Sequence, residues 1–91
     1  VMNSGQVCLS IERVYVDEAI HDAFVDRLTE KASAVDLNWP DIHKGHIGPL
    51  IFDRQAAVIE AHLADAVAKG ARVRCGGELV RRGGVWCPAT V

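Results

Sequence analysis

Two stretches of the chain repeat apolar residues at intervals of four, and this periodicity constrains the fold more than any other feature of the sequence. The members of the two repeats are Ile20, Phe24, Leu28, Ile59, Leu63 and Val67. Residues three or four apart lie on the same face of an α-helix, so each repeat predicts an amphipathic helix with one apolar stripe. The sequence therefore predicts two helices, the first at about 18–34.

Local signals indicate where these helices begin and end. Asp17 is expected to be the N-cap of the first helix, with Glu18 in its first turn, and Asp53 is a candidate N-cap for the second. Lys69 followed by Gly70 predicts the end of the second helix, because a cation suits the negative helix end and glycine can adopt the left-handed conformation.

Three segments rich in β-branched or aromatic residues predict strands. They are residues 9–16, 71–75 and 85–91, and a loop at 35–47 separates the two helices. The residues at 81–84 predict a turn between the last two strands. Alternating strands and helices indicate an α/β fold in the order β-α-α-β-β.

Composition excludes several functional classes. The chain has 91 residues, of which 49% are hydrophobic and 24% are charged, and its net charge is −2. A disordered tail would be poorer in aliphatic residues than this chain. The apolar runs of the chain are too short for a membrane-spanning helix. A nearly neutral chain is not a typical nucleic-acid binder, so we expect neither nucleic acid nor membrane as a partner.

The three cysteines, Cys8, Cys75 and Cys87, form no CxxC pair and are odd in number. We therefore expect free thiols and a reducing compartment, which indicates a cytoplasmic protein. Cys75 and Cys87 are expected to face each other as buried thiols across the last hairpin. A thiol-redox role for Cys8 is disfavoured because no resolving cysteine lies at short spacing.

Cys8 has two interpretations from its surroundings alone. A catalytic nucleophile needs an accessible thiol and backbone N–H groups near the developing oxyanion, and Gly5 would allow a ligand to approach the backbone closely. The alternative is a small buried hydrophobe, which is the common state of an isolated cysteine.

The sequence Asn-Ser-Gly-Gln-Val-Cys at residues 3–8, with Arg13 five positions later, resembles the active-site cysteine signature of the NAD(P)-dependent aldehyde dehydrogenase superfamily. Residues 48–51, 66–77 and 86–91 resemble successive later stretches of the same family. The resemblance runs in order over essentially the whole chain.

This resemblance implies that Cys8 is the catalytic nucleophile. Its thiolate would attack an aldehyde to give a thiohemiacetal, hydride would pass to NAD or NADP, and water, or coenzyme A in some relatives, would release the resulting thioester. The backbone N–H of Cys8 would supply half of the oxyanion hole. Gln55 matches a position at which some members contact the nicotinamide ribose, although it could equally be a solvated residue in a first helical turn.

Other elements of the family pattern are not in the sequence. The general-base Glu, the Asn that completes the oxyanion hole, the Glu-x-Phe-Gly-Pro motif and a Gly-rich phosphate-binding turn are all missing. We therefore expect residues 1–91 to be a single partial aldehyde-dehydrogenase-like catalytic domain with an incomplete sheet, lacking the cofactor-binding domain and inactive alone. It would belong to a longer protein that oxidises a small-molecule aldehyde.

Exposed strand edges in such a partial domain predict association into a homo-oligomer. An alternative function is a stand-alone interaction or structural module derived from a truncated dehydrogenase. His43 and His46 lie near Asp41, but no third soft ligand is evident, so we expect no metal site. The arginines near the last hairpin are expected to form a solvated face; they are Arg72, Arg74, Arg81 and Arg82.

Overall fold

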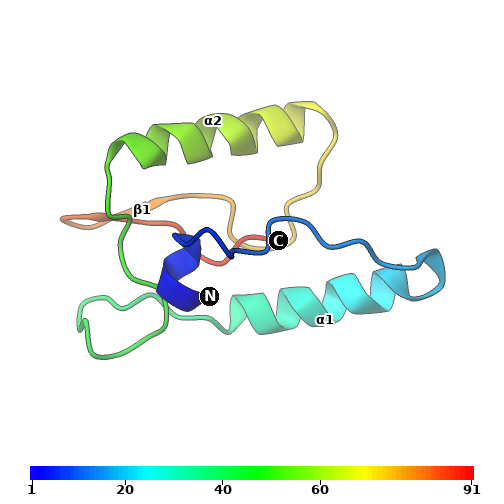
Figure 1. Ribbon diagram of the computed structural model, residues 1–91, viewed down its shortest axis with the longest axis horizontal. Helices are drawn as coiled ribbons and strands as arrows, with labels where there is room; N and C mark the ends of the chain where they lie inside the picture. The colour runs from blue at the N-terminus through cyan, green and yellow to red at the C-terminus, as the bar shows by residue number, and fades with distance from the viewer.

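The computed structural model describes residues 1–91, and its regular elements are two 3-10 helices, two α-helices and a short hairpin of two strands. They are the 3-10 helices η1 (Met2–Gly5) and η2 (Glu18–Ile20), the helices α1 (His21–Ser33) and α2 (Arg54–Ala68), and the strands β1 (Val80–Arg81) and β2 (Val85–Trp86). The hairpin and the C-terminal segment run between the two helices in Figure 1. No helix is both long enough and apolar enough to cross a bilayer.

The helices lie close to where the sequence predicts them. The Asp17 side chain accepts a hydrogen bond from the Ala19 N–H at 2.9 Å, which caps η2 as it leads into α1. Asp53 precedes α2 but forms no capping hydrogen bond through its side chain. Lys69 ends α2 and Gly70 follows with φ +95°, so the predicted stop signal is confirmed.

The hairpin is shorter than predicted: its second strand begins at Val85 as predicted but ends at Trp86, and its first strand is built from residues outside the predicted 71–75. Val80 pairs with Trp86 and Arg81 with Val85, whereas the strand predicted at 71–75 is not formed. Two features prevent the β-ladder from continuing beyond these two pairs toward residue 91. Pro88 has no N–H to donate, and the Gly77 N–H bonds the Thr90 hydroxyl at 3.1 Å instead of a backbone carbonyl.

The pairing register also corrects the expectation for the two hairpin cysteines. Val91 donates to the Cys75 carbonyl at 3.2 Å and accepts from the Arg74 N–H at 2.7 Å. Cys75 therefore lies beside Val91 and not opposite Cys87. Its thiol is a weak donor to the Ala89 carbonyl, with a sulfur–oxygen distance of 3.7 Å.

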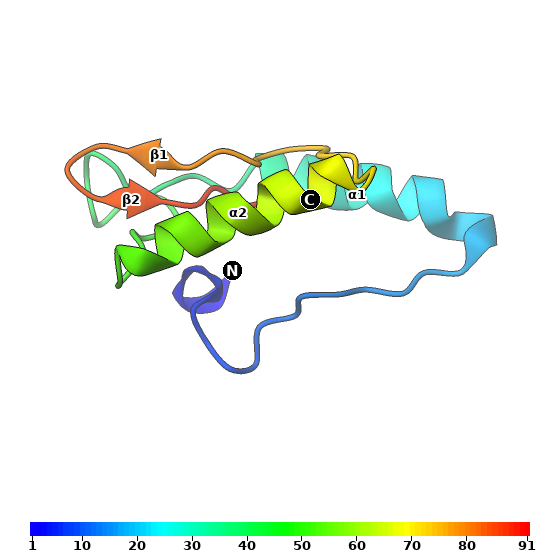
Figure 2. The ribbon, with the colours of Figure 1, turned by 90° about the horizontal axis from the view of Figure 1, so that it is seen from above.

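The strand predicted at 9–16 is wrong, and the observed order is α-α-β-β. Figure 2 shows this segment running extended along one side of the molecule. No other part of the chain pairs with it, and the side chains of Leu9, Ile11 and Tyr15 are 85%, 81% and 87% exposed. The segment has the composition of a strand, but a strand forms only where a second strand supplies backbone partners.

The core is small and lies near the start of α2. Its four buried side chains are Ile47, Leu50, Ala56 and Trp86. The Leu50 N–H donates to the Val85 carbonyl at 2.7 Å, and the Trp86 indole N–H donates to Asn38 Oδ1 at 2.9 Å. These bonds hold the loop at 35–47, through Asn38, and the segment after it, through Leu50, against β2.

Ion pairs connect both helices to the C-terminal third of the chain. Arg74 pairs with Asp26 on α1, and Arg81 Nη1 lies 2.8 Å from Glu60 Oε1 on α2. The hydrogen bond from Arg81 lowers the pKa of the Glu60 carboxyl below its ordinary value. Both pairs are exposed, so they fix orientation more than they add stability.

Candidate active site

The residues before Cys8 form a left-handed turn. Asn3, Ser4 and Gly5 have φ values of 47°, 57° and 76°. For residues other than glycine this conformation costs roughly 1–2 kcal/mol each, so surrounding contacts must hold it. The Asn3 side-chain amide donates to the Gln6 carbonyl at 3.2 Å, and the Gln6 side-chain amide donates back to the Asn3 carbonyl at 3.4 Å.

This turn is docked on residues 48–51, which precede α2. Ser4 Oγ accepts from the Gly48 N–H at 2.8 Å and donates to the Gly48 carbonyl at 3.3 Å. Gln6 Oε1 accepts from the Ile51 N–H at 2.8 Å, and Gln6 Nε2 donates to the Pro49 carbonyl at 3.3 Å. Two segments that both resemble family motifs are therefore joined by four hydrogen bonds. Sequence reasoning missed these contacts, and only the presence of both motifs could have indicated them.

Cys8 lies on a tight turn two residues after Gln6. The Ser10 N–H donates to the Val7 carbonyl at 3.0 Å, which places Cys8 at the second position of the turn. Its thiol is free and the residue is exposed, so Cys8 is not the buried hydrophobe of the alternative interpretation. Its backbone N–H donates to no group of the chain and is free to bond a ligand oxygen.

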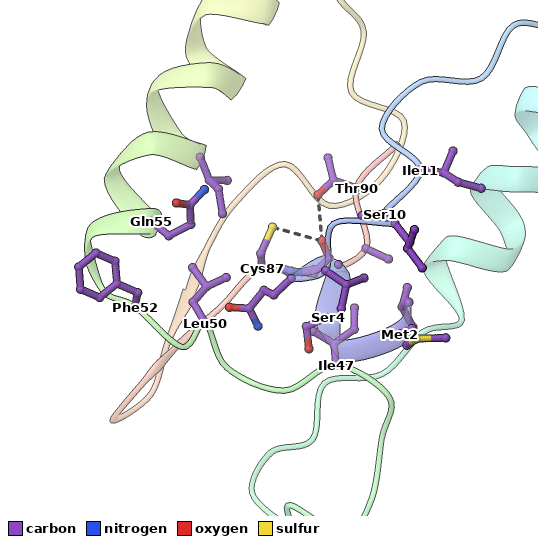
Figure 3. Close-up of a pocket in the computed structure, with 18 residues that line it drawn as sticks. Met2, Ser4, Ser10, Ile11, Ile47, Leu50, Phe52, Gln55, Cys87 and Thr90 are labelled. Atoms are coloured by element: carbon purple, nitrogen blue, oxygen red, sulfur yellow. Dashed lines mark hydrogen bonds between the residues drawn. The ribbon is translucent and has the colours of Figure 1, made fainter.

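A mainly apolar pocket of about 730 Å³ opens beside this turn. Figure 3 shows Gln55 and Leu50 on one side of it, Ser10 and Ile11 on the other, and Cys87 between them. Val7 and Leu9, the two neighbours of Cys8, also line the pocket, whereas Cys8 itself does not. The structure thus brings Gln55 and the residues flanking Cys8 to one pocket and leaves the Cys8 thiol outside its lining.

Cys87 is the only cysteine that lines the pocket. Burial raises the pKa of the Cys87 thiol, and a hydrogen bond with Thr90 offsets this rise only in part. The thiol is a weak donor to the Pro88 carbonyl at 3.6 Å, which also accepts from the Thr90 hydroxyl at 2.9 Å. A thiol held in its neutral form is a poor nucleophile, so Cys87 is suited to packing and not to covalent catalysis.

The remaining candidate residues have local partners. The His43 N–H donates to Asp41 Oδ1 at 2.9 Å, and His46 Nδ1 accepts from the Asp36 N–H at 3.2 Å. No group of three or more possible metal ligands lies together. Among the arginines near the hairpin, Arg74 and Arg81 form the ion pairs described above and Arg82 stacks on Trp39.

Comparison with protein families identifies the class to which this fold and this cysteine turn belong. The model of the aldehyde dehydrogenase family matches residues 1–91, so the chain belongs to the aldehyde dehydrogenase family.

Individual relatives agree with that assignment. The chain is 38% identical to succinate-semialdehyde dehydrogenase (NADP+) GabD of Escherichia coli over 98% of this chain and 18% of the relative. It is 44% identical to lactaldehyde dehydrogenase of the same organism over 100% of this chain and 19% of the relative. A crystal structure of lactaldehyde dehydrogenase from Escherichia coli superposes with a TM-score of 0.88 at 44% identity, covering 97% of this chain and 19% of that one. The chain therefore spans about a fifth of the length of these relatives.

Proposed function

We propose that residues 1–91 supply the nucleophilic cysteine of an NAD(P)-dependent aldehyde dehydrogenase, and that Cys8 is this nucleophile. The observation that carries the proposal is the position of Cys8. Its free thiol is exposed on a turn whose neighbours line an apolar pocket, and the signature residues before it are docked on a second family motif. Cys87 also lines this pocket, but burial raises the pKa of its thiol, and Cys75 lies outside the pocket lining with its thiol on the Ala89 carbonyl.

The chemistry proceeds on the sulfur of Cys8. The thiolate donates an electron pair to the aldehyde carbon, a carbon–sulfur bond forms, and the carbonyl oxygen becomes an oxyanion. The unpartnered N–H of Cys8 can donate a hydrogen bond to that oxygen. When the oxyanion collapses, the carbon gives up hydride and becomes a thioester. Water then attacks the thioester carbon, the carbon–sulfur bond breaks, and the carboxylic acid leaves with Cys8 restored.

The cofactor supplies the acceptor for that hydride when it is bound. Gln55 fits a contact with one end of such a cofactor, because its amide lines the pocket beside the neighbours of Cys8 and can donate and accept hydrogen bonds. The sequence holds no Gly-rich turn of the kind that binds the phosphates. Gln55 is therefore proposed only as a contact to the nicotinamide end, and either NAD or NADP suits it.

The surroundings of the site favour a small-molecule substrate. The pocket is mostly apolar, which suits a short aldehyde with a polar substituent; the polar residues in its lining are Ser4, Gln6, Ser10, Gln55 and Thr90. The three free cysteines suit a reducing cytoplasm. The unpaired extended segment at 10–17 favours association with a second copy or with another part of the same protein.

Aldehyde oxidation by the complete product of the gene that encodes this chain tests the proposal. Lactaldehyde and succinate semialdehyde are suitable probes, and the absorbance of reduced nicotinamide is the signal. We expect Cys8→Ser and Cys8→Ala to lower kcat by roughly 10³-fold or more, because loss of a nucleophile removes the covalent route. Cys75→Ser is the matched control and should keep the activity. Substantial turnover by both Cys8 variants would remove Cys8 from the mechanism.

A further inference from the structure

We propose that Ser4 and Gln6 are positioning residues for Cys8, an inference that rests on the proposed function of Cys8 as the nucleophile. Their side chains hold the left-handed turn before Cys8 on the backbone of residues 48–51. Through this contact they fix where the Cys8 turn lies relative to the pocket.

The first observation is the cost of the turn itself. Asn3 and Ser4 both have left-handed φ values, an unfavourable conformation for residues with a side chain. An unsupported segment of this kind would relax to a conformation with negative φ. Relaxation would rotate the chain entering residues 7–10, and the Cys8 thiol would move with it.

The second observation is how completely the two side chains engage the backbone of residues 48–51. The Ser4 hydroxyl both accepts from the Gly48 N–H and donates to the Gly48 carbonyl. The Gln6 amide does the same with two groups, accepting from Ile51 and donating to Pro49. Each side chain thus uses a donor and an acceptor, which fixes its orientation as well as its distance. The four bonds join positions 43 to 45 residues apart in sequence.

The third observation is that residues 48–51 are themselves fixed. Leu50 is buried, and its N–H donates to the Val85 carbonyl of β2 at 2.7 Å. Gln55 follows within the first turn of α2 and lines the same pocket as Val7 and Leu9. Ser4 and Gln6 therefore connect the cysteine turn to the segment that also places Gln55, so one rigid unit carries both groups.

The role predicts a defined kinetic effect in the complete gene product. We expect Gln6→Ala and Ser4→Ala to lower kcat by about 10–100-fold, because a displaced nucleophile loses the attack geometry. Ser4 and Gln6 also line the pocket, but the polar atoms of both side chains are engaged by the backbone of residues 48–51, so the KM values for aldehyde and cofactor should stay within about twofold. Ser33→Ala, at the exposed end of α1, is the control for serine removal and should keep the rate.

Hydrogen exchange supplies a readout that does not depend on turnover. The Ile51 and Gly48 N–H groups donate to Gln6 and Ser4, so Gln6→Ala should speed exchange at Ile51 and Ser4→Ala should speed it at Gly48, each about fivefold. Gln6→Glu separates the two halves of the Gln6 contact in case Gln6→Ala fails to fold. The carboxylate can still accept from Ile51 but faces the Pro49 carbonyl, so exchange should stay slow while kcat falls.

The outcomes separate this inference from the proposed function. An active unsubstituted protein whose folded Ser4→Ala and Gln6→Ala variants lose kcat, with Ser33→Ala active, supports the positioning role. Variants that keep kcat while exchange at Gly48 and Ile51 accelerates overturn it and leave Cys8 as the nucleophile. Inactivity of the unsubstituted protein toward aldehydes overturns the proposed function, and the positioning role with it.

Discussion

Gly45 is a position where one added methyl group should disturb the backbone of the 36–47 loop. It has φ +83°, and a Cβ atom built there would lie 2.5 Å from the Leu37 carbonyl oxygen and 2.9 Å from the Asn38 nitrogen. These are backbone atoms, so the loop must move to admit the methyl group. The left-handed conformation costs alanine about 1–2 kcal/mol, and the steric contact adds about 1–3 kcal/mol, the range found for overpacked sites.

The total for Gly45→Ala is therefore about 2–5 kcal/mol of local stability. Three backbone hydrogen bonds close this loop: Asn38 N–H to the Ile47 carbonyl, and the His46 and Ile47 N–H groups to the Asp36 carbonyl. Because 1.4 kcal/mol corresponds to a factor of ten, these amides should exchange roughly 30-fold faster or more in the variant. Native-state hydrogen exchange of the complete gene product, resolved by residue, is the assay.

Gly70→Ala is the matched control for the conformational part of this cost. Gly70 also has a positive φ, +95°, but nothing lies within 4 Å of the Cβ position. It should lose only about 1–2 kcal/mol, confined to the end of α2, and the amides of the 36–47 loop should be unaffected. Equal effects of the two substitutions on their own surroundings would refute the argument from close approach at Gly45.

Three further predictions concern charge, thiols and assembly. Arg81 lowers the folded-state pKa of Glu60, so the Arg81–Glu60 pair stabilises the fold at pH values above the unfolded-state carboxyl pKa of about 4.3, and this stabilisation is lost as the pH falls through the folded-state pKa. Glu60→Gln should therefore reduce the loss of melting temperature on acidification. An unchanged pH profile in this variant would contradict the stabilising role of the pair. Iodoacetamide should modify exposed Cys8 before Cys87, because burial raises the pKa of the Cys87 thiol and keeps it neutral, and peptide mass spectrometry can show this order. Faster labelling of Cys87 would contradict the assigned burial. The 91-residue chain by itself should be oligomeric or partly unfolded, because segment 10–17 has no paired strand. Size-exclusion and melting experiments test this, and a cooperatively melting monomer would contradict the prediction.

The helices could be predicted from the sequence because their signals are local. The four-residue repeats, Asp17 and the Lys69–Gly70 stop all act within a few positions, and the structure confirms them. The strands could be predicted only at Val85–Trp86, because each strand needs a partner that local composition does not identify. Segment 9–16 has a strand composition without a partner, and the ladder near 71–75 is interrupted where Gly77 bonds a side chain.

The candidate site, like the fold, could be predicted from the sequence only in part. Resemblance identified Cys8 and Gln55, and the structure adds that Gln55 shares a pocket with the neighbours of Cys8. The roles of both residues remain predictions. The contacts of Ser4 and Gln6 span more than forty residues and depend on a left-handed turn, so no periodicity and neither motif by itself could have predicted them. The register that separates Cys75 from Cys87 likewise depends on tertiary pairing.

The most direct test of the central claim is to locate the covalent intermediate. The complete gene product would be mixed with lactaldehyde or succinate semialdehyde and an oxidised nicotinamide cofactor, quenched in acid during turnover, digested, and mapped by peptide mass spectrometry. The proposed mechanism predicts an acyl group on the peptide that contains Cys8 and none in Cys8→Ser. Turnover with the acyl group on Cys75 or Cys87 would contradict the assignment of Cys8 as the nucleophile.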